Sequence, residues 1–236
     1  GPAQVSTVLA YGRPQGRGLT PETAFSEDDE PGPTLSQYAG SKAAGDRLAL
    51  AAMQSGEVEG CVVYLACCIG RDSKLLDPQR DVMRIRDLIE GNIPAIITSQ
   101  AVFTYVYVKD AAKAIVRAAE KEGNGGGERY LVGDQRLVTN EFYDLIAEIS
   151  GTPRPRFEVP AWLALSSGVV SSWWGRRVTG TTPTAPADLV RTAVGGNFLF
   201  DVSKSKSELG MTYTPVGVAL KEAVEYIRES ESQAPA

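Results

Sequence analysis

Two side chains able to exchange a proton stand four positions apart in this sequence, Tyr38 and Lys42. The surrounding residues, 34–50, predict a helix, because Thr34 can cap its free N–H groups and Gln37 follows at the spacing of a capping box. Residues four apart lie on one face of a helix, with Cβ atoms roughly 6 Å apart. A neighbouring ammonium favours the phenolate form of a tyrosine. The pair therefore predicts an acid–base residue, Tyr38, that is assisted by Lys42.

The same spacing occurs a second time, at Tyr105 and Lys109. Here the run 105–109 alternates aromatic and β-branched residues, which predicts a strand. Over four residues of a strand the two side chains are on the order of 13 Å apart. At that distance a phenol and an amine cannot act on each other, so only the first pair has a useful geometry.

A strand and a loop are predicted ahead of the helix. Residues 5–12 are typical of a buried strand that ends in a turn, with two hydroxyl side chains, Ser6 and Thr7, near its middle. Residues 13–33 are rich in glycine, proline and acidic side chains, which predicts a loop. Taken alone, this composition is typical of a mobile surface connection.

This order of elements resembles the extended short-chain dehydrogenase/reductase family, which includes NAD-dependent epimerases and dehydratases and dihydroflavonol-reductase-like enzymes. In that family the strand commonly reads Ser-Ser-x-x-x-Tyr-Gly, and its second hydroxyl is catalytic. Thr7 stands at that position here, a departure from serine. The resemblance implies that Thr7 bonds to the substrate, that Tyr38 exchanges its proton and that Lys42 holds the nicotinamide ribose. It also implies that the loop 13–33 is a fixed wall of the substrate pocket, and this interpretation and that of a mobile surface connection stay equally open.

The resemblance extends to two later segments. The apolar run 60–70 is typical of a parallel strand buried on both faces, and in the family the backbone after this strand passes the nicotinamide. Leu65 and Ala66 replace the usual Arg and Pro. In sugar-nucleotide members an Arg that pairs with the diphosphate stands where Phe103 is found, and an apolar ring cannot form that pair. The implied substrate is therefore a small or aromatic carbonyl or alcohol compound. The residues implied for NAD or NADP are Tyr38, Lys42, Ala66, Cys67 and Cys68, and those for substrate are Thr7, Tyr11 and Phe103.

Composition excludes several other classes of protein. The 236 residues are 43% hydrophobic and 22% charged, as in ordinary globular proteins. A net charge of -5 without a basic tract argues against nucleic acid as a partner. No apolar run has membrane-spanning length, and no signal sequence precedes the first strand. Three cysteines form no disulfide framework, which predicts reduced thiols in a cytoplasmic protein. The absence of histidine removes Ser-His-Asp, Cys-His and His-metal chemistry, and we expect no metal.

The remaining pattern predicts an α/β fold, and the resemblance implies that it is the C-terminal part of a Rossmann-like, doubly wound parallel sheet with a small, mostly helical substrate lobe. Residues 1–150 form the partial Rossmann-like domain, and residues 151–236 supply the lobe and a closing helix. The other predicted helices are 80–90, one that opens at Lys109, 140–149 with Thr139 as cap and Gly151 as stop, and 216–229. The other predicted strands are 94–98, 103–108 and 127–133, and apolar helical surface is predicted around Trp162, Trp173 and Trp174.

One expected part is missing from the sequence. The family's first βαβ units carry a Gly-rich turn that binds the pyrophosphate at a helix N-terminus. Gly1-Pro2 resembles a protease scar or a trimmed edge, and the glycine cluster 123–127 stands between a helix and a strand, in the wrong order. Three interpretations stay open: the missing half was removed or lies on another chain; the chain is a cofactor-free isomerase, cyclase or dehydratase; or it is a non-catalytic scaffold. We expect the open sheet edge to pair with the missing segment or to form a homodimer.

Overall fold

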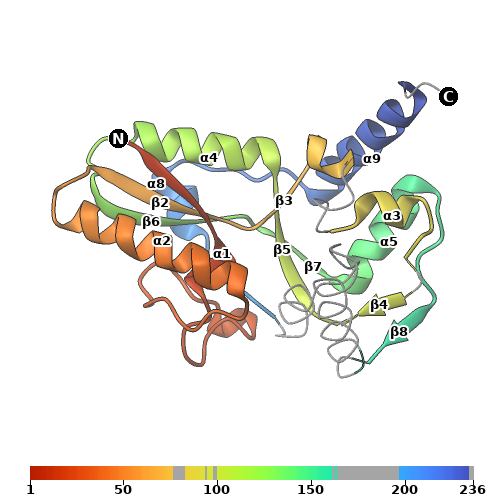
Figure 1. Ribbon diagram of the computed structural model, residues 1–236, viewed down its shortest axis with the longest axis horizontal. Coiled ribbons are helices and arrows are strands. Elements are labelled where there is room, and N and C mark those ends of the chain that lie inside the picture. The colour runs from red at the N-terminus through yellow and green to blue at the C-terminus, as the bar shows by residue number, and fades with distance from the viewer. Residues whose placement is uncertain (77–82, 94, 98–99, 161–162, 164–196, 234–236) are drawn as a thin grey trace, which may run out of the picture. The chain divides into compact units, whose positions relative to one another are not determined.

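The computed structural model describes residues 1–76, 83–93, 95–97, 100–160, 163 and 197–233. The chain divides into two compact units, each made of three segments (Figure 1). The first unit contains Gly1–Cys68, Phe103–Arg136 and Asn197–Val216; the second contains Ile69–Val102, Leu137–Gly196 and Gly217–Ala236. Because the units are interleaved along the sequence, neither coincides with the ranges 1–150 and 151–236.

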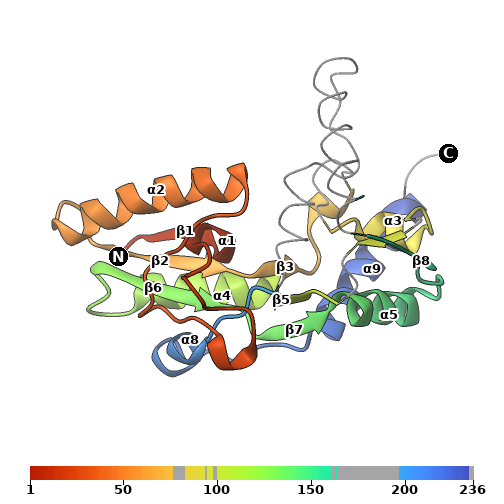
Figure 2. The ribbon, with the colours of Figure 1, turned by 90° about the horizontal axis from the view of Figure 1, so that it is seen from below.

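A parallel sheet forms the centre of the first unit. Its strands are β1 (Ala3–Thr7), β2 (Gly60–Leu65) and β6 (Gly126–Val132), in the order β1-β2-β6. Both pairings are parallel, and Thr7 lies opposite Leu65 at the carboxyl end of β1. Helices α2 (Gln37–Gln54) and α4 (Val108–Glu120) cover opposite faces of this sheet (Figure 2). The predicted α/β class with a parallel sheet is therefore confirmed.

The core of this unit is built from β-branched and aromatic residues of the sheet and from small residues of α4. Residues 60–64 of β2 are all buried, which confirms the prediction of a strand covered on both faces. Three alanines of α4, at positions 111, 114 and 118, pack against this core. The predicted single strand 60–70 is interrupted at Ala66, after which β3 (Cys67–Ile69) begins.

Two predicted boundaries at the start of the chain are wrong. The strand predicted for residues 5–12 ends at Thr7, because its hydroxyl accepts the N–H of Leu9 and caps a short helix, α1 (Val8–Tyr11). The main helix is capped by Ser36, not by Thr34. Ser36 is extended (φ -141°) directly before the helix, and its Oγ accepts the N–H of Ala39 at 3.1 Å.

The described chain contains further elements, of which α3, α5, α9, β4 and β5 correspond to predicted ones, whereas η1, η2, α8, β7 and β8 were not predicted. They are the 3-10 helices η1 (Pro21–Thr23) and η2 (Ser73–Leu76), the helices α3 (Ile85–Ile89), α5 (Thr139–Ser150), α8 (Ser203–Glu208) and α9 (Val216–Gln233), and the strands β4 (Ala95–Ile97), β5 (Val102–Tyr107), β7 (Gln135–Val138) and β8 (Phe157–Val159). Strand β4 pairs with β8 in parallel, and β3, β5 and β7 form a sheet in the order β3-β5-β7.

Within the second unit, several predictions can be compared with the structure. The helix predicted for residues 80–90 is described only as α3, and residues 77–82 lie outside the described chain, as do Trp162, Trp173 and Trp174. Thr139 is the first residue of α5 and not its cap: its hydroxyl donates to the carbonyl of Ala101 at 3.0 Å. Gly151 ends this helix with φ 75°, as predicted.

Among the described helices, none combines the length and apolar character needed to cross a lipid bilayer. Strand β1 is the end member of its sheet order, so the predicted open edge is present in the described part of the first unit. The glycine cluster 123–127 leads into β6 at the amino end of that strand. Since the strands are parallel, this is the opposite end of the sheet from Thr7, which lies at the carboxyl end of β1. Residues 123–125 are therefore a connecting loop, as predicted, whereas Gly126 and Gly127 begin β6.

Candidate active site

The first two turns of α2 carry the predicted acid–base pair. Tyr38 is 53% exposed, and Lys42, one turn later, is also exposed. A buried stripe of Ala39, Ala43 and Asp46 faces the sheet along the same helix. The small alanines allow the helix to approach the strands closely, and the phenol of Tyr38 and the amine of Lys42 are on the exposed part of the helix.

Thr7 lies at the carboxyl ends of the strands, and α2 starts at this same end of the sheet. Strands β1 and β2 are parallel and α2 connects them, so the helix must run back and its first turn must start near the strands' carboxyl ends. Thr7 ends β1, and α1, which follows it directly, lies beside the first turns of α2 (Figure 1). The topology thus brings the three predicted catalytic residues to one end of the sheet.

The three residues implied for cofactor contact follow β2 at this end. The N–H of Ala66 donates to the carbonyl of Val132 at 2.8 Å, and Ala66 is buried. Cys67 is half-buried and Cys68 exposed. Burial raises the pKa of the Cys67 thiol to about 12. A thiol with that pKa stays protonated near neutral pH, so Cys67 is a poor nucleophile.

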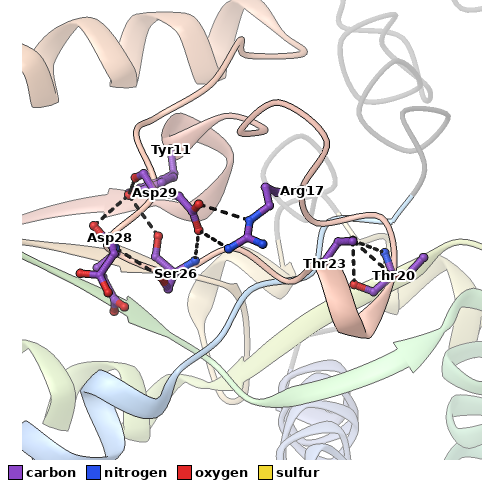
Figure 3. Close-up of polar contacts among 8 residues, drawn as sticks. Tyr11, Arg17, Thr20, Thr23, Ser26, Asp28 and Asp29 are labelled. Atoms are coloured by element: carbon purple, nitrogen blue, oxygen red, sulfur yellow. Dashed lines mark hydrogen bonds and ion pairs between the residues drawn. The ribbon is translucent and has the colours of Figure 1, made fainter.

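Tyr11 is buried in the core, whereas a residue that contacts a ligand is accessible to it. Its side chain is 0% exposed, and its hydroxyl contacts the carbonyl oxygens of Ser26 and Glu27, each at 3.3 Å, and of Asp29 (Figure 3). Burial raises its pKa far above the ordinary range. Tyr11 therefore holds the loop 13–33 from inside, and this placement favours a supporting part over direct contact with substrate.

The loop 13–33 is folded onto the core. Phe25 is fully buried and stacks on Tyr11 with ring centroids 5.4 Å apart, and it also meets the rings of Phe198 and Phe200. The carboxylate of Asp29 accepts the N–H of Ser26 at 2.9 Å and pairs with Arg17 at 3.2 Å (Figure 3). Of the two interpretations of this loop, these contacts favour the fixed wall.

Glu27 joins this loop to the sheet. Its buried carboxylate accepts the N–H of Leu131, on β6, at 2.6 Å. Since β6 is the other end member of the sheet order, this carboxylate satisfies a backbone group on an edge strand. Burial raises the pKa of Glu27 above its ordinary value.

Phe103 is half-buried in β5. That strand belongs to the sheet β3-β5-β7, which is not the sheet that carries Thr7. A role of Phe103 in substrate binding therefore stays a prediction from the resemblance.

The structure adds one residue that the sequence reasoning did not single out, Asp46, and pairs it with Ser6. The hydroxyl of Ser6, on β1, donates to the carboxylate of Asp46, on α2, at 2.5 Å, and both residues are buried. The available signal was the position of Asp46, four residues after Lys42 on the same helix face.

Among the described residues, no group of three or more acidic or cysteine side chains is arranged to hold a metal ion.

A family model for the NAD dependent epimerase/dehydratase family matches residues 3–133 of this chain, more than half of its length. The chain belongs to this family. The match covers the strand with Thr7, the helix with Tyr38 and Lys42, and β2, so the resemblance drawn from these motifs is confirmed.

Two curated relatives match parts of the chain. A protein of Synechocystis sp. that is named as a dihydroflavonol 4-reductase is 29% identical over 105 residues, 43% of this chain and 29% of that protein. Sterol demethylase protein B of Methylococcus capsulatus is 28% identical over 146 residues, 61% of this chain and 43% of that protein. The alignments thus span less than half the length of either relative.

Solved structures share the fold. A nucleoside-diphosphate-sugar epimerase of Pseudomonas aeruginosa superposes with a TM-score of 0.72 at 21% identity, covering 97% of this chain and 66% of that one. The UDP-glucose 4-epimerase of Thermotoga maritima, solved with UDP-glucose, gives a TM-score of 0.68 at 23% identity, covering 97% and 63%. A dTDP-glucose 4,6-dehydratase of Bacillus anthracis, solved with NAD, gives 0.66 at 19% identity, covering 98% and 62%.

Proposed function

We propose that this chain carries the catalytic half of an NAD(P)-dependent oxidoreductase or epimerase that acts on a small or aromatic carbonyl or alcohol compound. The observation that carries the proposal is the exposed Tyr38–Lys42 pair on the first turns of α2, at the sheet edge where Thr7 ends β1. Membership of the family supports the same reaction class.

Each of the three residues has a distinct role in this proposal. The hydroxyl of Thr7 donates a hydrogen bond to the substrate oxygen and fixes its position. Tyr38 gives its phenolic proton to that oxygen, or takes one from it, and the Lys42 ammonium, one turn later on the same helix, donates hydrogen bonds to the nicotinamide ribose. The nicotinamide, when bound, supplies or accepts the hydride, while the protein provides orientation and electrostatics.

The residues at this edge suit the nicotinamide end of a dinucleotide. Lys42 offers an exposed ammonium that can donate to the ribose hydroxyls, and Cys68, which follows the end of β2, is exposed. The pyrophosphate needs a Gly-rich turn at a helix N-terminus, and the cluster 123–127 lies at the opposite sheet edge. We therefore assign only the nicotinamide half of the cofactor site to these residues.

The substrate class rests on Phe103 and on the names of the relatives. An apolar ring in place of an arginine removes the charge that a diphosphate requires. The curated relatives are named for reductase and sterol chemistry, whereas solved neighbours carry sugar nucleotides. We favour a carbonyl compound without a diphosphate, and UDP-glucose is the comparison substrate that tests this choice.

The test uses the protein expressed from the whole gene. Binding of NADH and NADPH is followed by fluorescence, and turnover is measured with 4-nitrobenzaldehyde, a panel of small ketones, and UDP-glucose. Tyr38→Phe is expected to lower turnover by about 10²–10⁴-fold while cofactor binding is kept. Tyr226→Phe, a half-buried tyrosine in α9 of the second unit, is the matched control.

Lys42 can be tested in the same way. Lys42→Met is expected to weaken NADH binding as well as turnover, because one ammonium serves both, whereas Lys113→Met on the exposed side of α4 changes neither. Unchanged turnover in Tyr38→Phe removes Tyr38 from the mechanism. Activity without cofactor binding favours a cofactor-free isomerase, cyclase or dehydratase, and the absence of both favours a scaffold.

A further inference from the structure

One contact between the loop 13–33 and the central sheet is made by a group that can lose a proton. Glu27 is 6% exposed, and its Oε1 accepts the backbone N–H of Leu131, on β6, at 2.6 Å. Two residues earlier in the loop, the N–H of Phe25 donates to the carbonyl of Leu199 at 3.2 Å. Because backbone groups keep the same charge at every pH, a change of pH acts on this contact through the carboxyl group of Glu27.

The carboxylate of Glu27 is buried without a counter-ion. Among the described residues, none forms an ion pair with it. The ammonium of Lys204, in α8, attracts it but lies over the ring of Tyr130, 4.9 Å from the ring centroid, and the carboxylate of Asp201 repels it. A carboxylate that is removed from water without a counter-ion is less stable than the neutral acid. Burial accordingly raises the pKa of Glu27 above its ordinary value.

The other groups around Glu27 do not cancel this effect. Its pKa stays raised because burial outweighs the N–H of Leu131 and the N–H of Glu27 itself, which favour the charged form. Tyr11, whose hydroxyl contacts the carbonyl of Glu27, is buried and neutral. The guanidinium of Arg129, on β6, lies over the Tyr11 ring, 5.5 Å from its centroid. The other charged residues of this part of the loop are the Arg17–Asp29 pair and the exposed Asp28 and Glu30.

We propose that Glu27 is a pH-dependent latch, a contact that closes the loop 13–33 on β6 when its proton is bound. The neutral carboxyl group still accepts the N–H of Leu131 and is buried at little cost. After the proton is lost, the buried charge favours conformations in which the loop opens and water reaches the carboxylate. The consequence for substrate binding rests on the function proposed above, in which this loop is a wall of the pocket and is more firmly closed in acid.

The direction and size of the effect follow from proton linkage. With the loop open, Glu27 titrates near its ordinary pKa of 4.5; with the loop closed, its pKa is higher. Below pH 4.5 the latch is therefore at full strength. Between the two pKa values the open fraction rises up to about tenfold for each pH unit, and above the raised pKa it is constant. The total increase is thus about tenfold for each unit by which burial raises the pKa.

The test measures local opening by hydrogen exchange in the protein expressed from the whole gene. The backbone amides of Leu131 and Phe25 are followed by NMR from pH 4 to 8, and each rate is divided by the intrinsic rate of an unprotected amide at that pH. Glu27→Gln keeps an oxygen that accepts the N–H of Leu131 but cannot ionise. Glu30→Gln, an exposed glutamate in the same loop, is the matched control. The carboxyl carbon resonance of Glu27 reports its pKa directly.

We expect the corrected exchange of both amides to rise with pH in wild type and in Glu30→Gln, by the factor that the measured pKa of Glu27 sets, and to stay constant in Glu27→Gln. The same pH dependence in Glu27→Gln and wild type, or titration of Glu27 at or below pH 4.5, overturns the latch.

A second measurement addresses the substrate. The ratio of the wild-type KM to that of Glu27→Gln, with the carbonyl compound that wild type turns over fastest, should rise over the same pH range, and a constant ratio overturns the link to substrate binding. Full activity of Tyr38→Phe overturns the proposed function instead. Because hydrogen exchange needs no turnover, it tests the latch in either case.

Discussion

Removing the hydroxyl of Tyr11 tests whether this residue holds the loop or touches the substrate. Tyr11→Phe keeps the ring, its stacking on Phe25 and its edge contact with Tyr64 at 5.1 Å. It removes only the hydroxyl that meets the carbonyl oxygens of Ser26, Glu27 and Asp29. The loop 13–33 therefore loses an internal support without loss of apolar packing.

The size of the effect follows from counting donors. One hydroxyl has one proton, so it donates to one carbonyl at a time although three are near. A typical hydrogen bond contributes about 1 kcal/mol, and a buried acceptor left without a partner adds about 1–3 kcal/mol. Since the loop carbonyls are only partly buried, we expect a loss of about 2 kcal/mol. For a protein of this size that loss lowers Tm by about 4–8 °C.

Two assays follow this change. Urea unfolding reports the loss of stability, and limited trypsin digestion reports local opening of the loop, because the side chain of Arg17 lies in it and is 44% exposed. If opening and closing are fast, cleavage scales with the open population, and about 2 kcal/mol raises it by roughly 30-fold. Tyr226→Phe, in the second unit, is again the control and should leave cleavage at Arg17 unchanged.

The opposite pattern would refute this assignment. If Tyr11→Phe leaves stability and cleavage at wild-type values but changes kcat/KM, the hydroxyl contacts substrate as the family resemblance implies. If stability and kcat/KM both fall in Tyr11→Phe, the loop 13–33 affects the reaction through its position.

Two further perturbations have expected outcomes. Glu27→Gln tests pH dependence: because burial raises the folded-state pKa of Glu27, its contribution to stability is full below its ordinary value and is lost as pH rises through the raised pKa. Wild type should therefore lose stability relative to Glu27→Gln above about pH 4.5, as measured by urea midpoints from pH 4 to 8; a constant difference would contradict this. Gly12→Ala tests the turn after α1: Gly12 has φ 73°, and a Cβ there would lie 2.1 Å from the carbonyl oxygen of Gly32. We expect a loss of more than about 2 kcal/mol, and an unchanged Tm would show that the loop can move away.

The sequence was sufficient where local pattern and tertiary structure agree. The period-two run at 103–108 formed a strand up to Tyr107, the apolar run at 60–65 formed another, and Gly151 ended its helix, because in each case burial and backbone preference favour the same conformation. The predicted strand residue Val108 instead begins α4. Tyr38 and Lys42 could be predicted as neighbours since helical spacing alone brings them together.

Predictions failed where two residues competed for one role. Thr34 and Ser36 can both cap a helix, and only the backbone conformation at Ser36 decides which does. Thr7 could continue the strand or cap a turn, and its hydroxyl took the N–H of Leu9. Such choices depend on differences of about 1 kcal/mol between caps, which are smaller than a sequence pattern resolves.

The hydrogen bond between Ser6 and Asp46 could not be predicted from the sequence for another reason. Its partners are 40 residues apart and belong to a strand and a helix, so no local pattern joins them. Likewise, the burial of Tyr11 follows from Phe25, Phe198 and Phe200, which come from distant parts of the chain. Contacts of this kind are fixed by topology and appear only once the strands are in register.

Both buried carboxylates of this region serve the carboxyl end of the sheet or the loop that leaves it. Asp46 fixes α2 to β1, and Glu27 fixes the loop 13–33 to β6. Each lies in an environment that raises its pKa, so each reduces stability at neutral pH relative to an uncharged residue. Each also joins an element near Thr7 to the sheet, so the helix α2 and the loop 13–33 are held in place before a ligand binds.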